Sequence, residues 1–257
     1  MIDRPTTPNL PYPPNPSFGH GAARRRIEIV GVRHGSSARL IDPFHEMECE
    51  LVHDGARVSA VSARMHRYPT TLCPGATLVL QELVGLPLGC DGDRFYAGGA
   101  MRRHCTHLFD LAYLALSHAA RGEGRRCYDV VVPDERDAPV VVELSRDHSP
   151  LLSWTVRRGV VISPLELAGL PLLKGFWARA AEHFAGDELE AALVLARTYM
   201  IAVGRAYDAE SWAGQPPSRN AALRDRCYGY ASSHGDRGEF RGGYVRDFSE
   251  GIPPSEP

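Results

Sequence analysis

The sequence is poor in lysine: Lys174 is its one example, and the remaining basic residues are arginines. The formal net charge is −2, so no excess of positive charge attracts nucleic acid or an anionic membrane. No apolar run approaches the roughly 20 residues that a membrane-spanning helix needs. We therefore expect neither nucleic acid nor membrane as a partner.

Several signatures of cofactor and zinc proteins are also missing. Gly19-His20-Gly21 lacks the third glycine of a dinucleotide-binding fingerprint, and there is no P-loop and no Gly-x-Ser-x-Gly motif. The stretch 45–49 lacks the second histidine of a zincin. The six cysteines contain no CxxC pair, which argues against a zinc knuckle. We expect no cofactor, no bound metal and reduced cysteines.

The N-terminus has neither the basic start nor the apolar core of a signal peptide, so we expect a cytoplasmic protein. Residues 1–23 contain six prolines and predict an extended arm. We expect at least two of its large side chains to be buried, against the second half of the chain or across a homodimer interface. These side chains are Ile2, Leu10, Tyr12 and Phe18.

A content of 44% hydrophobic and 23% charged residues is typical of a globular protein. Hydrophobic periodicity predicts an α+β fold of two related halves, 24–123 and 124–209, each with antiparallel strands followed by two helices. Residues 210–257 are rich in glycine and aromatic residues and predict a tail that wraps the body. In the first half we expect strands at 26–33, 46–52 and 57–65 and helices at 73–84 and 102–120. In the second half we expect strands at 128–133, 139–144 and 151–162 and helices at 164–184 and 187–207.

An internal duplication would explain the repeated order of elements. At a constant offset of 93, four residues of the first half fall on identical residues of the second. They are Glu50, Leu51, Asp54 and Arg64, which fall on Glu143, Leu144, Asp147 and Arg157. The helix of the second half has no His-Cys pair, so the duplication predicts a site in the first half alone.

Residues 103–120 carry the densest group of reactive side chains. Helical spacing predicts that His104 and Cys105 face the interior in the first turns of a helix, with His107 at the border of the apolar stripe. A thiol at a helix N-terminus, next to arginines and a histidine, is expected to have a lowered pKa. The alternative is a buried cysteine that only packs.

Two motifs in the first half resemble a known family. Cys73 begins the predicted first helix, and Cys105-Thr106-His107-Leu108 begins the second. In this pattern, over roughly residues 26–122, the chain resembles the bacterial family known as domain of unknown function 2889. The resemblance implies no established activity.

The same region resembles, more distantly, the iron–sulfur cluster scaffold proteins. They share an antiparallel hairpin, a cysteine-bearing loop that enters a helix, and a later helix that starts with His-Cys-Ser/Thr, here residues 104–106. The scaffold's first cysteine and its neighbouring aspartate are replaced by Pro43-Phe44-His45, so Asp42 or His45 would have to substitute as a ligand. This resemblance implies a carrier of zinc, an iron–sulfur cluster or sulfur.

Three functions remain open: acid–base catalysis with or without metal, a metal or sulfur carrier, and binding without catalysis. The absence of a redox signature favours an enzyme that catalyses isomerisation, cyclisation, hydration or hydrolysis of a small, largely apolar metabolite. The expected catalytic residues are His104, Cys105, His107 and Asp110. The expected substrate-binding residues are Cys73, Tyr113, Tyr228 and Tyr230.

Overall fold

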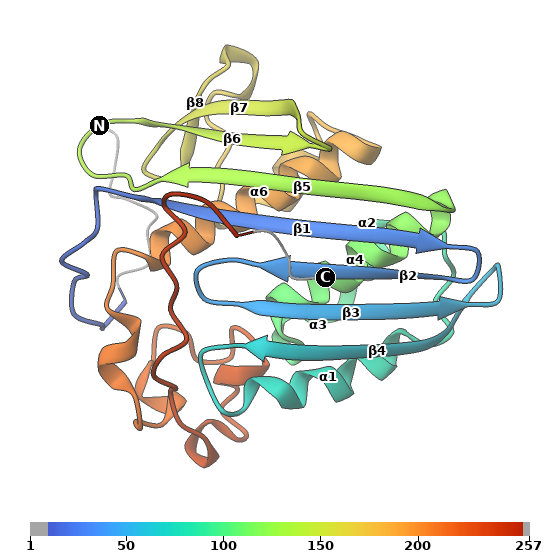
Figure 1. Cartoon of the computed structure of the whole chain (residues 1–257), viewed down its shortest axis with the longest axis horizontal. Helices are drawn as coiled ribbons and strands as arrows, with labels where there is room; N and C mark the ends of the chain where they lie inside the picture. The colour runs from blue at the N-terminus through green and yellow to red at the C-terminus, as the bar shows by residue number, and fades with distance from the viewer. Residues whose placement is uncertain (1–9, 254–257) are drawn as a thin grey trace. The chain divides into compact units, whose positions relative to one another are not determined.

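A computed structural model describes residues 10–253 (Figure 1). The chain divides into two units. Unit 1 contains the residues up to Arg26, Cys127–Ala209 and the residues from Arg246 onward, and unit 2 contains Ile27–Arg126 and Glu210–Val245. The strands of each unit pair antiparallel and are followed by helices, which confirms the predicted α+β class.

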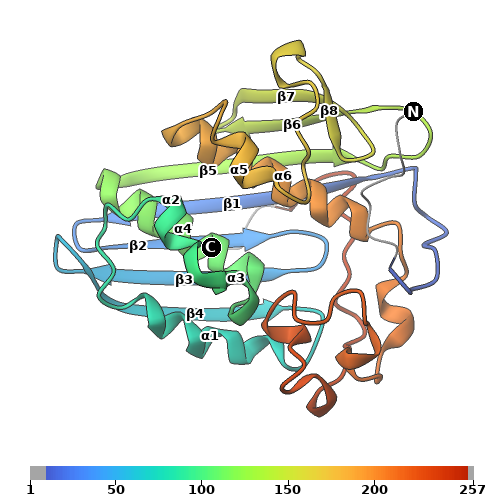
Figure 2. The same cartoon turned by 180° about the vertical axis from the view of Figure 1, so that it is seen from behind.

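Unit 2 is built on an antiparallel meander of β2 (Gly35–Ile41), β3 (Glu46–His53) and β4 (Val58–Arg67). Alternate residues of β3 are buried, as a strand with one covered face requires. Helix α4 (Thr106–Arg121) covers that face and packs on β2 and β3 (Figure 2). Strand β1 (Ala22–Val32) supplies its residues from Ile27 onward to this unit.

Short helices connect β4 to α4 in unit 2. They are η1 (Cys73–Gly75), α1 (Ala76–Val79), η2 (Leu80–Leu83), α2 (Gly92–Phe95), η3 (Ala97–Gly99) and α3 (Ala100–Arg103). After η2 the chain returns to the start of β4: Gly85 N–H donates to Val58 O (2.8 Å), and Val58 N–H donates to Leu86 O (2.9 Å).

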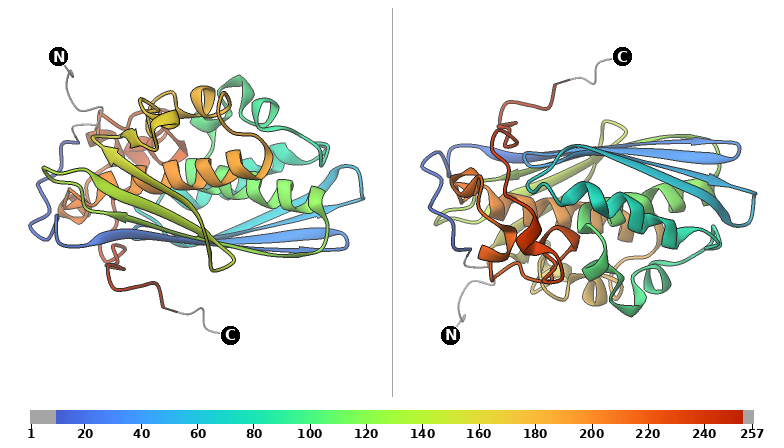
Figure 3. Two further views of the ribbon diagram at one scale, coloured as in Figure 1. Left: turned by 90° about the horizontal axis from the view of Figure 1, so that it is seen from above. Right: turned by 90° about the horizontal axis from the view of Figure 1, so that it is seen from below.

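Unit 1 contains an antiparallel meander of β5 (Gly124–Pro133, from Cys127 onward), β6 (Val140–Arg146), β7 (Ser149–Arg157) and β8 (Val160–Ser163). The η4 turn (Leu165–Leu167), α5 (Phe176–Ala180) and α6 (Gly186–Gly204) follow, and α6 packs on β6 (Figure 3). A single strand over 151–162 is wrong because Arg158 and Gly159, with φ of 50° and 78°, form a turn. A continuous helix over 164–184 is also wrong, because Gly169 and Gly175 take positive φ and break it.

The two units share a sequence that sequence analysis missed. Glu-Leu-x-Gly-Leu-Pro-Leu occurs at 82–88 and again at 166–172. In unit 1, Gly169 N–H donates to Val161 O (2.9 Å) and Val161 N–H donates to Leu170 O (2.9 Å), the pattern made by Gly85, Val58 and Leu86 in unit 2. The duplication stays a prediction, and this match supports it with a register that aligns β4 with β8. The offset of 93 instead aligns β3 with β6.

The N-terminal arm packs within unit 1. Asn15 N–H donates to Ala206 O (2.9 Å), and Asp208 N–H donates to Pro13 O (2.8 Å). Tyr12 is buried and both Leu10 and Phe18 are half-buried, whereas Ile2 lies outside the described residues. The arm thus lies against the second half of the chain, and the homodimer stays a prediction.

The tail divides between the units. Residues 210–245 belong to unit 2 and contain short 3-10 helices, among them η7 (Tyr228–Tyr230). A bridge between Thr70 and Phe240 and a hydrogen bond from Arg241 N–H to Pro69 O (2.8 Å) attach this segment to the end of β4. Within residues 10–253, the helices are too short or too polar to cross a membrane.

Candidate functional site

The start of α4 differs from the prediction. Helix α3 ends at Arg103, His104 is extended with φ −100° and ψ 167°, and Cys105 is the N-cap of α4. The expected single helix from residue 102 is therefore wrong. Tyr228 N–H donates to His104 O (3.0 Å), so the tail occupies the carbonyl at which the helix is interrupted.

Three thiols from distant segments gather here: Cys73, Cys105 and Cys227. Burial raises the pKa of Cys105 well above its usual value, and the neighbouring thiols of Cys227 and Cys73 raise it further. Backbone N–H groups of Leu108 and His107 lower this pKa, but they are the smaller effect. The pKa of Cys105 is therefore raised and not lowered as the sequence predicts, because desolvation outweighs the helix N-terminus.

The pKa values of Cys227 and Cys73 are also raised by burial. Burial raises the pKa of Cys227 to about 12 and also raises the pKa of Cys73, although a hydrogen bond to Thr70 Oγ1 (3.2 Å) lowers the latter. A Cβ on Gly229 would lie 3.0 Å from Cys73 Sγ, so the tail packs closely on this thiol. Within residues 10–253, no three Cys, His, Asp or Glu side chains are arranged to hold a metal ion.

His104 is an interior histidine. It is 1% exposed, its ring stacks on Phe109 with centroids 4.2 Å apart, and its Nε2 lies 3.4 Å from Glu82 Oε2. Its Nδ1 has no hydrogen-bond partner among the described residues. Burial lowers the pKa of His104 from 6.5, although Glu82 raises it, so the neutral ring is favoured.

Asp110 and Tyr113 belong to an aromatic cluster along α4. Tyr96 O–H donates to Asp110 Oδ1 (2.9 Å), and the Tyr96 and Tyr113 rings are 5.3 Å apart. Tyr228 and Tyr230 pack on different neighbours, His234 and Phe240. The structure therefore distributes the expected site residues among several side-chain groups.

The ring of His107, on α4, packs against a histidine from the turn between β2 and β3. His107 is half-buried, and its ring lies 4.0 Å from the ring of His45, at an interplanar angle of 30°. His45 Nδ1 lies 3.1 Å from Asp42 Oδ1 and 3.3 Å from Oδ2. Asp42 is fully buried and His45 is 6% exposed. The three residues form the Asp42–His45–His107 group.

The turn between β2 and β3 positions this group. Asp42 Oδ1 accepts the backbone N–H groups of Phe44 and His45, both at 2.8 Å. The buried guanidinium of Arg67 donates to the carbonyls of Asp42, Pro43 and His45 and to that of Tyr244 from the tail. A carboxylate that already accepts two N–H groups favours the His45 tautomer with Nδ1–H, which leaves Nε2 to accept a proton.

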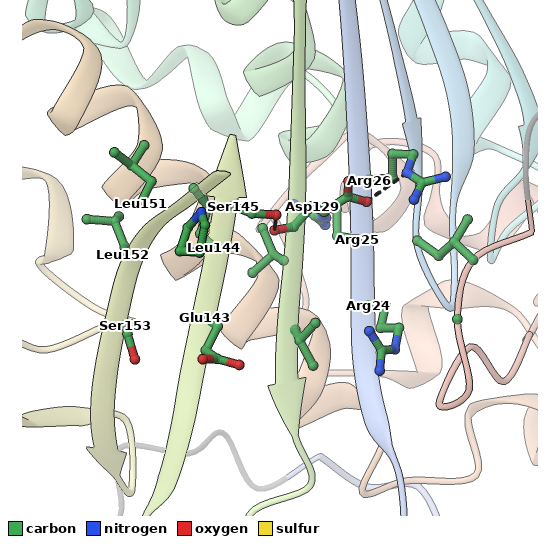
Figure 4. Close-up of a pocket in the computed structure, with 15 residues that line it drawn as sticks. Arg24, Arg25, Arg26, Asp129, Glu143, Leu144, Ser145, Leu151, Leu152 and Ser153 are labelled. Atoms are coloured by element: carbon green, nitrogen blue, oxygen red, sulfur yellow. Dashed lines mark hydrogen bonds and ion pairs between the residues drawn. The ribbon is translucent and has the colours of Figure 1, made fainter. Parts of the chain in front are cut away.

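A groove of about 500 Å³ lies in unit 1, on the strands β1, β5, β6 and β7 (Figure 4). Arg26 pairs with Asp129 in it (2.7 Å), and Arg24 Nε donates to Ser249 O (3.1 Å). None of the expected site residues lines this groove, and its lining contains no histidine or cysteine. It offers charge pairs and apolar surface, but no imidazole or thiol for proton transfer.

Comparison with known proteins agrees with the sequence resemblance. Residues 28–121 match the model of a family described as protein of unknown function (DUF2889). The match lies in unit 2 and includes the Asp42–His45–His107 group. No curated protein and no solved structure matches the chain. The predicted resemblance to this family is confirmed, whereas the resemblance to iron–sulfur scaffolds stays a prediction.

Proposed function

We propose that unit 2 is catalytic, and that the protein is a cytoplasmic bacterial enzyme for non-redox acid–base chemistry on a small, largely apolar metabolite. The reaction would be an isomerisation, cyclisation, hydration or hydrolysis. The observation that carries the proposal is the buried Asp42–His45 pair stacked against the half-buried ring of His107. His107 is the expected catalytic residue to which the structure adds a second imidazole.

The pair has the parts that a general base needs. Asp42 orients the His45 ring and stabilises it when it carries a proton, and His45 Nε2 is the atom that accepts the proton. His107 is half-buried, so it can contact a substrate and supply the second proton-transferring group. Phe44 and Tyr244, with ring centroids 6.4 Å apart, give the surroundings an apolar character that suits an apolar metabolite.

The thiol group of Cys73, Cys105 and Cys227 is the feature that favours the alternative, a metal or sulfur carrier. A sulfur carrier requires a thiolate, and a metal carrier requires several ligand side chains arranged around one ion, a group of three or more that residues 10–253 do not contain. Burial raises the pKa of all three thiols and so favours the protonated form. Acid–base catalysis by the histidines is therefore the better-supported function.

The test compares the protein with His107→Ala on a bacterial metabolite extract, analysed by mass spectrometry. We expect at least one metabolite to be consumed by the wild-type protein and not by His107→Ala. His66→Ala is the matched control, because His66 is exposed and pairs with Glu48 on the surface. An extract that changes equally with His107→Ala and the wild type, or with neither, would contradict the proposal.

A further inference from the structure

Arg241 differs from the other arginines that are partly removed from solvent. Its guanidinium lies 4.3 Å from the centroid of the Tyr68 ring, and the residue is half-buried. Among the described residues no hydrogen-bond acceptor or carboxylate pairs with this guanidinium. Arg39, by contrast, is half-buried and pairs with Glu46 (2.7 Å), and Arg205 is buried and pairs with Asp134 (2.9 Å).

The missing partner affects the free energy of the Arg241 guanidinium. Partial removal of a guanidinium from water costs free energy, which a carboxylate or carbonyl partner normally offsets. At Arg241 the ring of Tyr68 offsets part of this cost by a cation–π contact, and it also orients the guanidinium plane. The hydrogen-bonding edges of the guanidinium remain available to an anion.

Arg241 is attached to the end of β4, and this end of the strand pairs with β3 next to the turn that holds His45. Its backbone N–H donates to Pro69 O (2.8 Å), and Tyr68 directly follows Arg67. Arg67 donates in turn to His45 O (2.8 Å) and to Tyr244 O (3.0 Å). The Arg67 side chain thus connects the end of β4, to which Arg241 is attached, with the turn that holds His45.

We propose that Arg241 binds a carboxylate of the substrate, so that the metabolite is an apolar acid. This inference rests on the proposed function and names its substrate class. A carboxylate suits the site better than a phosphate because one planar guanidinium neutralises one charge and can bind both carboxylate oxygens. Arg241 would be a specificity-determining residue, and His45 and His107 would remain the proton-transferring groups.

Binding of simple probes tests the proposal without a known substrate. Benzoate, phenylacetate and hexanoate are compared with their neutral amides by NMR titration of the wild-type protein. We expect at least one acid to bind tenfold or more tightly than its amide, and inorganic phosphate not to displace it at equal concentration. Equal binding of acids and amides would overturn the proposal, and displacement by phosphate would overturn the assignment to a carboxylate.

Variants assign the preference to Arg241. Arg241→Gln should abolish the preference of acid over amide, and Arg241→Lys should retain part of it. Arg237→Gln, an exposed arginine of the same tail, is the matched control and should leave the preference unchanged. His107→Ala should retain the preference. If Arg241→Gln retains the preference for acids, the carboxylate site is wrong, whereas the proposed acid–base catalysis is not contradicted. If His107→Ala still turns over the metabolite, the proposed catalysis is wrong, whereas the carboxylate site is not contradicted.

Discussion

The two units share a hydrogen-bonded segment that returns to the last strand, and they differ in the turn that holds Asp42 and His45 in unit 2. In both, Glu-Leu-x-Gly-Leu-Pro-Leu returns to pair with the first residues of the last strand. When β4 is matched with β8, the turn of unit 2 at 42–45 corresponds to the turn of unit 1 at 147–148. The latter is a tight turn in which Asp147 and His148 take φ of 52° and 66°. In the longer turn of unit 2, the carboxylate of Asp42 contacts the ring of His45.

Strand length accounts for part of the difference. Strand β4 has 10 residues and β8 has 4. The additional length of β4 brings Arg67 to the 42–45 turn, where its guanidinium donates to the carbonyls of Asp42, Pro43 and His45. Unit 2 thus differs from unit 1 by one longer turn and one longer strand, and these two differences bring Asp42, His45 and Arg67 together.

The largest expected effect comes from replacing the histidine of each turn, His45 in unit 2 and His148 in unit 1, with asparagine. His45→Asn should lower turnover of the metabolite found with the extract by about 10²–10⁴-fold, the usual range for loss of a general base. His148→Asn should leave turnover unchanged, because asparagine tolerates the positive φ of that position. Steady-state rates of the two variants, with melting temperatures as the folding control, decide the matter. Equal losses would show that the longer turn has no special role.

Local patterns predicted much of the secondary structure of unit 2. The expected strand at 46–52 matches β3 (Glu46–His53), because its hydrophobic alternation reports burial of one face. Strand β2 was missed, since Gly35-Ser36-Ser37-Ala38 has little of the bulk typical of a strand. The break at His104 was also missed, because it depends on a hydrogen bond from Tyr228 in the distant tail.

The candidate site was predicted less completely. His107 was expected, and Asp42 and His45 were considered as substitute ligands, but their stacking depends on how α4 packs on β2 and β3. Cys227 and Arg241 were missed because only tertiary structure brings the tail to Cys73 and Tyr68. The sequence did contain one signal for the relation between the two halves. The repeat at 82–88 and 166–172 aligns the segments that follow β4 and β8, which the four isolated identities do not.

Cysteines of the two units should differ in reactivity. At pH 8 in the native protein, iodoacetamide should modify Cys127 of unit 1 before Cys105 of unit 2, which is buried, and before Cys227, which is half-buried like Cys127 but has a raised pKa. A rise in the pKa of Cys227 from 9.0 to about 12 lowers its thiolate fraction by about a thousandfold. Peptide mapping by mass spectrometry gives the order, and the unfolded protein is the control, in which all cysteines should react alike. Rapid native labelling of Cys105 would restore the reactive thiol that the structure argues against.

A smaller effect tests the shared segment itself. Gly85 and Gly169 take φ of 89° and 94°, and a Cβ at either would meet nothing within 4 Å. Gly85→Ala and Gly169→Ala should therefore each lower the free energy of unfolding by about 1–2 kcal/mol, from backbone strain alone. Urea denaturation measures both values. If one substitution leaves the free energy of unfolding unchanged while the other lowers it by this amount, the two glycines do not have the same structural role.

The smallest effect concerns the first residue of the repeat. Glu82 lies near His104, whereas Glu166 is exposed and forms no ion pair among the described residues. Because burial lowers the pKa of His104 below 6.5, the unfolded chain takes up a proton that the native state resists, so stability falls as the pH drops through 6.5. His104→Gln should flatten the decline in melting temperature between pH 7.5 and pH 5. Glu82→Gln should steepen it, because Glu82 raises the pKa of His104. Glu166→Gln, the matched substitution in unit 1, should leave the decline in melting temperature unchanged. An equal response of Glu82→Gln and Glu166→Gln would contradict an effect of Glu82 through His104.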